Sequence, residues 1–302
     1  MTDLAAPTTL TPRSQPKPSS RARLSRAAPY ILLTPGILWL LIFFVFPTIW
    51  MLLISLSTGT IETGFRLTLS FDAYATALRD FSRQFGNSIA FASISTFLCF
   101  AIGFPVAYTI AFRGGRYKNL LLFLVIAPFF TSFLIRTISW KILLGDNGPL
   151  FSLLKGLNIV SPDFSVLGTS LAVVAGLTYN FLPFMILPLY VSLEKIPTHL
   201  IEASHDLYAG RWGAFRRVVL PLSLPGVFAG SLLTFIPALG DYVNPDLLGN
   251  PSTRMIGNVI QSQFFQLGNY QVPAALSFIL MTAILVAVFI YARALGTEEL
   301  TG

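Results

Sequence analysis

Ionisable side chains that could do chemistry are scarce in this 302-residue chain. The two histidines, His199 and His205, lie in one charged segment but lack the spacing of a metal site. The single cysteine, Cys99, sits in an apolar run, so the chain can form no internal disulfide or cysteine cluster. We find no Ser-His-Asp set, no paired carboxylates and no His-rich set. These absences argue against a membrane-embedded enzyme such as an acyl or glycosyl transferase.

Two carboxylates have positions suited to a cation path. Asp241 follows the uncharged run 218–240, and Asp246 comes shortly after it. Ionisable groups at membrane depth usually face protein or a water-filled path, and rings such as Tyr242 and Trp140 attract cations. We therefore expect these four residues to line a translocation path or gate. The alternative is that Asp241 only marks the outer end of a helix.

The composition indicates that a membrane surrounds the elements that position these residues. Hydrophobic residues make up 54% of the chain and charged residues 11%, whereas soluble domains carry about 25% charged residues. The net charge of +7 arises from basic residues scattered between apolar runs. Lipid headgroups are therefore the expected partner of this charge, and nucleic acid is not.

Uncharged runs long enough to cross a bilayer occur six times, and they lack the alternation of membrane strands. The sequence therefore predicts an all-α membrane protein with six transmembrane helices. The runs are 27–61, 84–112, 119–135, 164–193, 218–240 and 255–292. Arg136 follows the third run, where it either pairs with a carboxylate of the path or fixes a helix end at headgroup level.

The distribution of basic residues predicts the orientation. Most of the 20 basic residues fall on one side if both termini are cytoplasmic. Residues 1–28 are rich in proline, serine and arginine and are expected to form a disordered cytoplasmic tail. The transmembrane domain is then 29–295, with a charged cytoplasmic loop at 194–221 and a second tail at 296–302.

The loop 194–221 carries the most specific pattern. Apolar residues at helical spacing from 198 to 208 predict a short helix, and Gly210 and Gly213 permit a bend before a second apolar stripe. By pattern alone, this helix-turn-helix could simply rest on lipid headgroups.

The order Glu202-Ala203-Ser204, then Val218-Val219-Leu220-Pro221, resembles the EAA motif of binding-protein-dependent ABC importers. In that family the loop is a coupling helix that docks on an ATPase subunit. Ser204 replaces the second alanine, and Tyr208 occupies the glycine position, so we expect Gly210 to take the bend instead. The residues assigned to ATPase coupling are Glu202, Ala203, Ser204, Asp206, Leu207, Tyr208, Gly210, Leu220 and Pro221.

The resemblance implies partners. The chain has no Gly-Lys pair and hence no phosphate loop of its own. It needs no cofactor itself, and ATP and magnesium would be bound by two partner ATPase subunits. A second permease subunit, identical or related, and an extracytoplasmic substrate-binding protein complete the expected assembly in the bacterial inner membrane.

Three further stretches resemble the permeases of the spermidine and putrescine importers. The first is 128–137 together with 144–148, the second is 182–190, and the third is 235–242 together with 255–258. The implied cargo is a polyamine. Ferric iron or an aminophosphonate, carried by similar machinery, is the alternative. An autonomous secondary transporter is a further alternative, but it would be expected to show inverted repeats and more buried ionisable residues.

Overall fold

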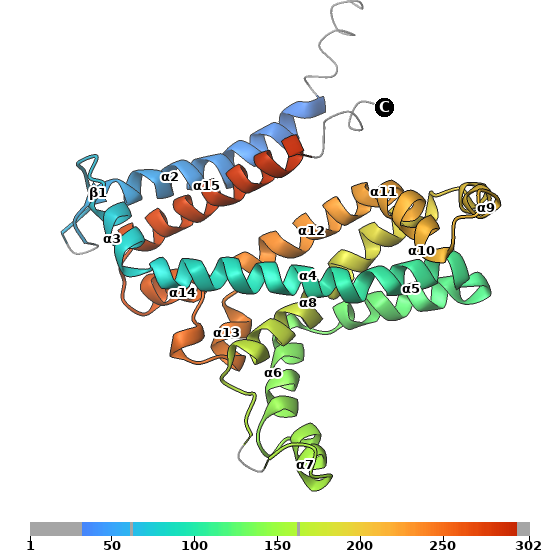
Figure 1. Cartoon of the computed structure of the whole chain (residues 1–302). Coiled ribbons are helices and arrows are strands. Elements are labelled where there is room, and N and C mark those ends of the chain that lie inside the picture. Colours follow the sequence, from blue (N-terminus) through green and yellow to red (C-terminus); the bar gives the residue numbers. More distant parts are fainter. Residues whose placement is uncertain (1–31, 61–62, 162–163, 295–302) are drawn as a thin grey trace, which may run out of the picture. The chain divides into compact units, whose positions relative to one another are not determined.

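A computed structural model of the chain describes residues 32–60, 63–161 and 164–294 (Figure 1). The expected tails, 1–28 and 296–302, lie outside the described residues. The chain divides into two compact units, Met1–Met51 and Leu52–Gly302, and each is described by itself. The described part is mostly helical, as the apolar runs predict.

The first apolar run, expected at 27–61, forms a helix over Leu32–Ser55. Its middle widens into a π-helical turn, η1 (Leu41–Val45), before α2 (Phe46–Ser55) continues. Pro47 accounts for this widening, because proline has no N–H to donate and its ring clashes with the carbonyl four residues earlier. The run is therefore one helix with a local defect.

Three long helices form the centre of the second unit: α4 (Ser82–Arg113), α8 (Ser170–Glu194) and α12 (Leu224–Leu239) (Figure 1). Their facing sides are apolar and bury most of the main hydrophobic cluster. Between α4 and α8, the buried Cys99 Sγ donates to the carbonyl of Thr178 at 3.3 Å. Cys99 is thus a small packed side chain.

Two glycines of α12 let it approach α8 closely. A Cβ atom at Gly226 would lie 2.5 Å from Ser192 Cβ, and one at Gly230 would lie 2.8 Å from Met185 Sδ. Such distances are too short for any real side chain. Small residues four apart permit this kind of contact between membrane helices.

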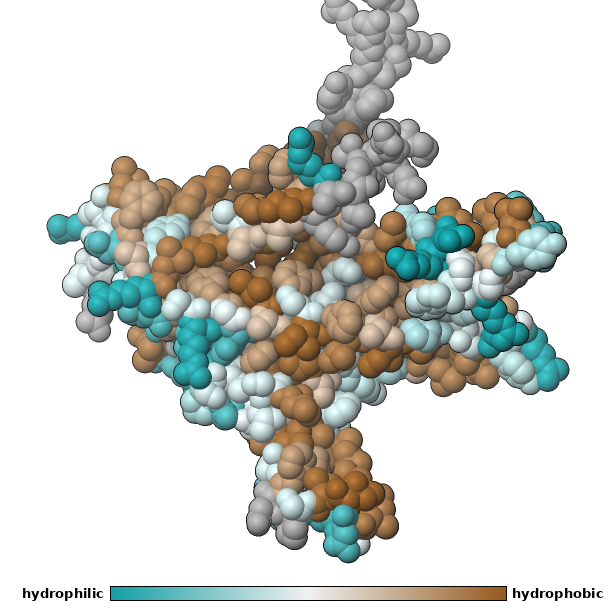
Figure 2. Space-filling model, in the orientation of Figure 1, coloured by the Kyte–Doolittle hydropathy of each residue, from teal (hydrophilic) through white to brown (hydrophobic). Residues whose placement is uncertain are grey.

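The third apolar run is broken. It forms α5 (Lys118–Ile126) and the 3-10 turn η3 (Ala127–Phe130), and after an extended residue at Thr131 the chain starts α6 (Phe133–Leu144). The parts before and after the break meet at 91°. Pro128 is near the break, where its missing N–H favours the end of a helix. Figure 2 shows largely apolar surface over α6 and the short helix after it.

The fifth run is also bent, because Arg211–Leu222 and Leu224–Leu239 meet at 64°. The first part contains α10 (Arg211–Ala214), the π-helical turn η4 (Phe215–Val219) and α11 (Leu220–Leu222). As in the first helix, the π-helical turn is followed within two residues by a proline, here Pro221.

The sixth run also forms two helices instead of one, α14 (Ile256–Phe265) and α15 (Gln271–Ala294). A small antiparallel hairpin, which was not expected from the sequence, pairs Ser57 with Leu67 and Thr58 with Arg66. The remaining elements are β1 (Ser57–Thr58), β2 (Arg66–Leu67), α3 (Asp72–Asp80), η2 (Gly115–Tyr117), α7 (Pro149–Gly156), α9 (Thr198–Asp206), α13 (Val243–Leu248) and η5 (Pro251–Thr253).

Among the described residues, four helices are long and apolar enough to cross a membrane. The number rises to six if each bent pair is one span. The fold is therefore helical with four to six candidate spans.

Candidate coupling loop and polar cluster

The loop 194–221 presents one short helix, α9, beyond the end of α8. Glu202, Ala203 and Asp206 are exposed on this helix. Ser204 is partly buried, and its hydroxyl donates to the carbonyl of Ile201 at 2.7 Å. The hydroxyl of this serine, at the second alanine position, is therefore hydrogen-bonded within the helix, and the exposed face of the helix is unchanged.

Tyr208 makes the turn after α9, and the expectation that Gly210 makes it is wrong. Tyr208 has a φ of 60°, in the left-handed region, whereas Gly210 has a φ of −65°. The N–H of Ala209 donates to the carbonyl of Ser204 at 3.0 Å. This bond is the six-to-one bond of a Schellman motif, which ends a helix on one left-handed residue. The position of that residue is fixed by the helix end, so a glycine two residues later cannot replace it.

Aromatic packing connects the second half of the loop to the body of the second unit. The ring of Phe215 meets the ring of Phe104 on α4 edge to face, with centroids 5.4 Å apart. Leu220 is partly buried against the same apolar cluster, while Pro221 is exposed. These packed side chains connect the second half of the loop to α4 and to the main apolar cluster.

An ion pair holds the base of the loop. Lys118 Nζ lies 2.5 Å from Glu194 Oε1, joining the start of α5 to the end of α8. The same ammonium group lies 5.3 Å from the centre of the Tyr190 ring. The start of α5 and the end of α8 are therefore linked to each other next to the loop.

A second polar group, which we call the polar cluster, consists of Thr137, Asn180, Asp241 and Asn244. Asp241 is 8% exposed, and its carboxylate accepts hydrogen bonds from Val243 N at 2.7 Å and Asn244 N at 3.2 Å. It also accepts one from Asn244 Nδ2 at 2.5 Å. Burial raises the pKa of this carboxyl group, and the hydrogen bonds from Asn244 and Val243 oppose that rise.

The polar cluster continues through two amides. Asn180 Nδ2 donates to Asn244 Oδ1 and to Thr137 Oγ1, each at 3.2 Å. Asn180 Oδ1 is buried without a partner among the described residues. The cluster thereby joins α6, α8 and α13, and the Asn180 oxygen within it accepts no hydrogen bond from the described residues.

Arg136 lies near the start of α6 and is 8% exposed. Its place at headgroup level stays a prediction. Its guanidinium carbon lies 5.3 Å from the centre of the Phe129 ring and 5.8 Å from that of Phe133. Nε and Nη1 are buried without an acceptor among the described residues. No described carboxylate pairs with it, so the aromatic rings are its main neighbours here.

The other expected path residues are dispersed. Tyr242 and Asp246 are exposed. Trp140 is partly buried, with its ring 5.3 Å from that of Tyr179. Sequence reasoning missed Asn180 and Asn244 because it marked charged residues only. For Asn180, an uncharged amide inside the run 164–193 was the available signal; Asn244 lies outside the six runs.

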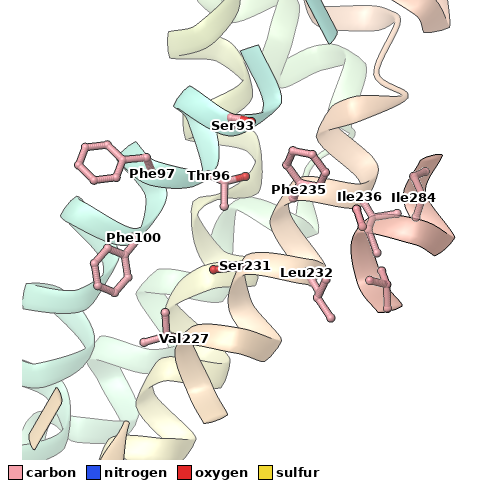
Figure 3. Close-up of a pocket in the computed structure, with 12 residues that line it drawn as sticks. Ser93, Thr96, Phe97, Phe100, Val227, Ser231, Leu232, Phe235, Ile236 and Ile284 are labelled. Atoms are coloured by element: carbon pink, nitrogen blue, oxygen red, sulfur yellow. The ribbon is translucent and has the colours of Figure 1, made fainter. Parts of the chain in front are cut away.

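Figure 3 shows a groove between α4, α12 and α15 with a volume of about 420 Å³. Phe97, Phe100 and Phe235 dominate its lining, and Ser93, Thr96 and Ser231 supply hydroxyl groups. No charged residue lines it. A multiply charged cation would find no counter-charge here, so this apolar groove is not a site for such a ligand.

Within the described ranges, no group of three histidine, cysteine, aspartate or glutamate residues could hold a metal ion.

Comparisons with known proteins agree over most of the chain. The family described as binding-protein-dependent transport system inner membrane component matches residues 100–296. The spermidine/putrescine transport system permease protein PotB of Haemophilus influenzae is 37% identical over 257 residues, covering 85% of this chain and 90% of that protein. PotB of Escherichia coli is 35% identical over 257 residues, covering 85% of this chain and 94% of that protein.

Solved structures show the same fold. A chain of a bacterial ABC transporter that imports the acidic polysaccharide alginate has a TM-score of 0.72 at 19% identity, covering 93% of this chain and 98% of that one. A chain of the MetNI methionine ABC transporter has a TM-score of 0.54 at 22% identity, covering 71% of this chain and 94% of that one. At these identities the likeness concerns the fold alone.

Proposed function

Since this chain belongs to the family of binding-protein-dependent transport system inner membrane components, we propose that it is the permease subunit that passes spermidine and putrescine through the bacterial inner membrane. The similarity to the PotB permeases across most of both chains is the observation that carries this proposal. The chain is a multi-pass permease of an ABC importer and supplies transport, not catalysis.

The proposed topology has six spans with both termini in the cytoplasm. Counting each bent pair as one span gives this number. The excess of basic residues on the side of the loop 194–221 supports the orientation. The loop is then accessible to cytoplasmic proteins.

The proposed assembly contains two ATPase subunits, a second permease and an extracytoplasmic binding protein. ATP and magnesium belong to the ATPase subunits. The loop 194–221 would dock on one of them, with Glu202 and Asp206 exposed on α9 for this contact. Its packed links to α4 and α12 provide the route by which a movement of the ATPase reaches the membrane helices.

The proposed path runs past the end of α12. Tyr242 and Asp246 are exposed there, and the buried carboxylate of Asp241 belongs to the polar cluster next to them in the chain. A carboxylate in a low-dielectric setting attracts a cation more strongly than one in water. Trp140 and Arg136 are proposed to shape the same region from α6, Arg136 as a fixed positive charge that keeps the cation off this helix.

The test is uptake by the assembled importer, purified through a tag on this chain and placed in proteoliposomes. We expect ATP-dependent uptake of labelled spermidine that excess putrescine inhibits, and no uptake with ADP. Ferric iron and 2-aminoethylphosphonate are the matched competitors. If either of them is transported while excess spermidine has no effect, the polyamine assignment fails.

A further inference from the structure

Tyr208 combines an unusual backbone with an unusual exposure. It is the left-handed residue of the Schellman motif after α9, and its side chain is 98% exposed. The neighbouring Leu207 is 81% exposed. Two large apolar side chains therefore project together from the turn of a polar loop.

The left-handed conformation is unfavourable for tyrosine. A non-glycine residue there costs on the order of 1 kcal/mol relative to glycine. Among the described residues, the Tyr208 side chain has no hydrogen bond or ring contact that would offset this cost. Strained residues of this kind persist at positions where the side chain serves a binding function.

Charge distinguishes a protein partner from the membrane surface. Around Tyr208, α9 exposes Glu202 and Asp206, and no lysine or arginine occurs from 198 to 210. Anionic headgroups would repel this surface. The following segment, from Arg211 on, exposes three arginines and a tryptophan, which suit headgroups. Figure 2 shows hydrophilic and apolar side chains both reaching the surface around α9 and α10.

We propose that Tyr208 anchors this chain to its ATPase subunit. The ring enters an apolar pocket on the ATPase, Leu207 covers the edge of that pocket, and basic groups around it meet Glu202 and Asp206. The inference rests on the proposed function in one respect only, namely that an ATPase subunit docks on the loop. It adds which side chain makes the contact selective, because a glycine at this position would form the same turn without the ring.

The proposal predicts effects of opposite sign on stability and on binding. Tyr208→Gly and Tyr208→Asn relieve the backbone strain, since both residues accept a left-handed conformation, and both remove the ring. We expect each to raise the thermal unfolding midpoint of the full-length chain in detergent. We expect each to weaken ATPase binding at least tenfold, while Tyr208→Phe binds within twofold of the native chain.

Binding is measured on membranes that carry the full-length chain and its partner permease, stripped of ATPase and titrated with the purified ATPase subunit. Trp212→Ala is the matched control, because it removes another exposed aromatic ring from the same loop. It should leave ATPase binding unchanged. Native affinity in Tyr208→Gly would overturn the proposal, as would a loss in Tyr208→Phe equal to that in Tyr208→Gly.

A separate measurement tests the alternative that the Tyr208 ring binds the membrane surface. If Tyr208→Gly in the full-length chain leaves ATPase binding intact and makes the loop 194–221 more accessible to protease in phosphatidylglycerol proteoliposomes, the ring is a membrane anchor and the proposal is wrong. ATPase binding is measured without cargo, so it is independent of the uptake experiment. An importer that carries a different cargo would refute the polyamine assignment and leave the result for Tyr208 standing.

Discussion

Replacing Asp241 with asparagine separates its two possible roles. The path role needs the negative charge of the carboxylate, whereas the structural role needs its hydrogen-bond acceptors. Asparagine retains one acceptor for the backbone N–H groups of Val243 and Asn244, which lie 2.7 and 3.2 Å from Asp241 Oδ1. It loses the charge and places an NH₂ group against Asn244 Nδ2.

The polar cluster can absorb that change. Asn244 can rotate its amide so that its oxygen faces the new NH₂ group, and Asn180 can then turn its unpaired Oδ1 toward Asn244. Turning Asn180 also gives up its bond to Thr137 Oγ1. The net loss is therefore one charge-assisted and one neutral hydrogen bond, or roughly 2–4 kcal/mol of unfolding free energy. Asp241→Ala removes all three acceptor contacts and leaves buried donors unpaired, so we expect a loss of roughly 3–5 kcal/mol.

The assay compares both variants with the native importer in proteoliposomes. Unfolding is followed in detergent, and spermidine uptake is normalised to assembled complex. We expect Asp241→Asn to assemble and keep its basal ATP hydrolysis, with uptake lowered about tenfold, equivalent to ~1.4 kcal/mol. Native uptake by Asp241→Asn would show that the charge has no part in the path. Asp241 would then only cap α13.

Further predictions concern coupling and packing. Glu202→Lys should leave membrane insertion intact and lower cargo-stimulated ATP hydrolysis about tenfold, because it reverses a charge at the proposed contact; unchanged stimulation would exclude that contact. Gly230→Val should lower the unfolding free energy by roughly 1–3 kcal/mol, because its Cβ would lie 2.8 Å from Met185 Sδ. Gly86→Ala is the control, because no atom lies within 4 Å of the added Cβ. We expect it to raise the unfolding free energy by about 0.5–1 kcal/mol, since alanine favours a helix more than glycine does. A loss of unfolding free energy equal to that of Gly230→Val would contradict the packing argument.

Hydropathy predicts where helices form but not where they bend. The uncharged run 84–112 corresponds closely to α4 (Ser82–Arg113). The run 119–135 is equally apolar, yet the chain turns by 91° within it. A count of charges shows where a helix can form but not in which direction the chain continues. The bend in this run depends on Pro128 and on the extended backbone of Thr131. Pro128 was visible in the sequence, but Pro105 and Pro183 lie inside helices that continue, so proline alone does not identify the break.

The candidate sites were predictable to different degrees. The short helix α9 follows from helical spacing, and its proposed role follows from the resemblance of its motif. The turn at Tyr208 was misjudged because backbone preference was given more weight than the geometry of the helix end. Only one member of the polar cluster was predicted. Asp241 carries a charge and was therefore recognised, whereas Asn180 and Asn244 join it through tertiary contacts that sequence periodicity does not predict.

The close contact of α8 and α12 has a mechanical consequence. The loop 194–221 leaves the end of α8 and returns to the start of α12, so both of its ends are attached to the same helix pair. Gly226 and Gly230 allow α12 to pack closely against α8. If the loop docks on an ATPase subunit as proposed, we therefore expect a movement of the loop to displace α8 and α12 as one unit. A larger side chain at either glycine would weaken that link.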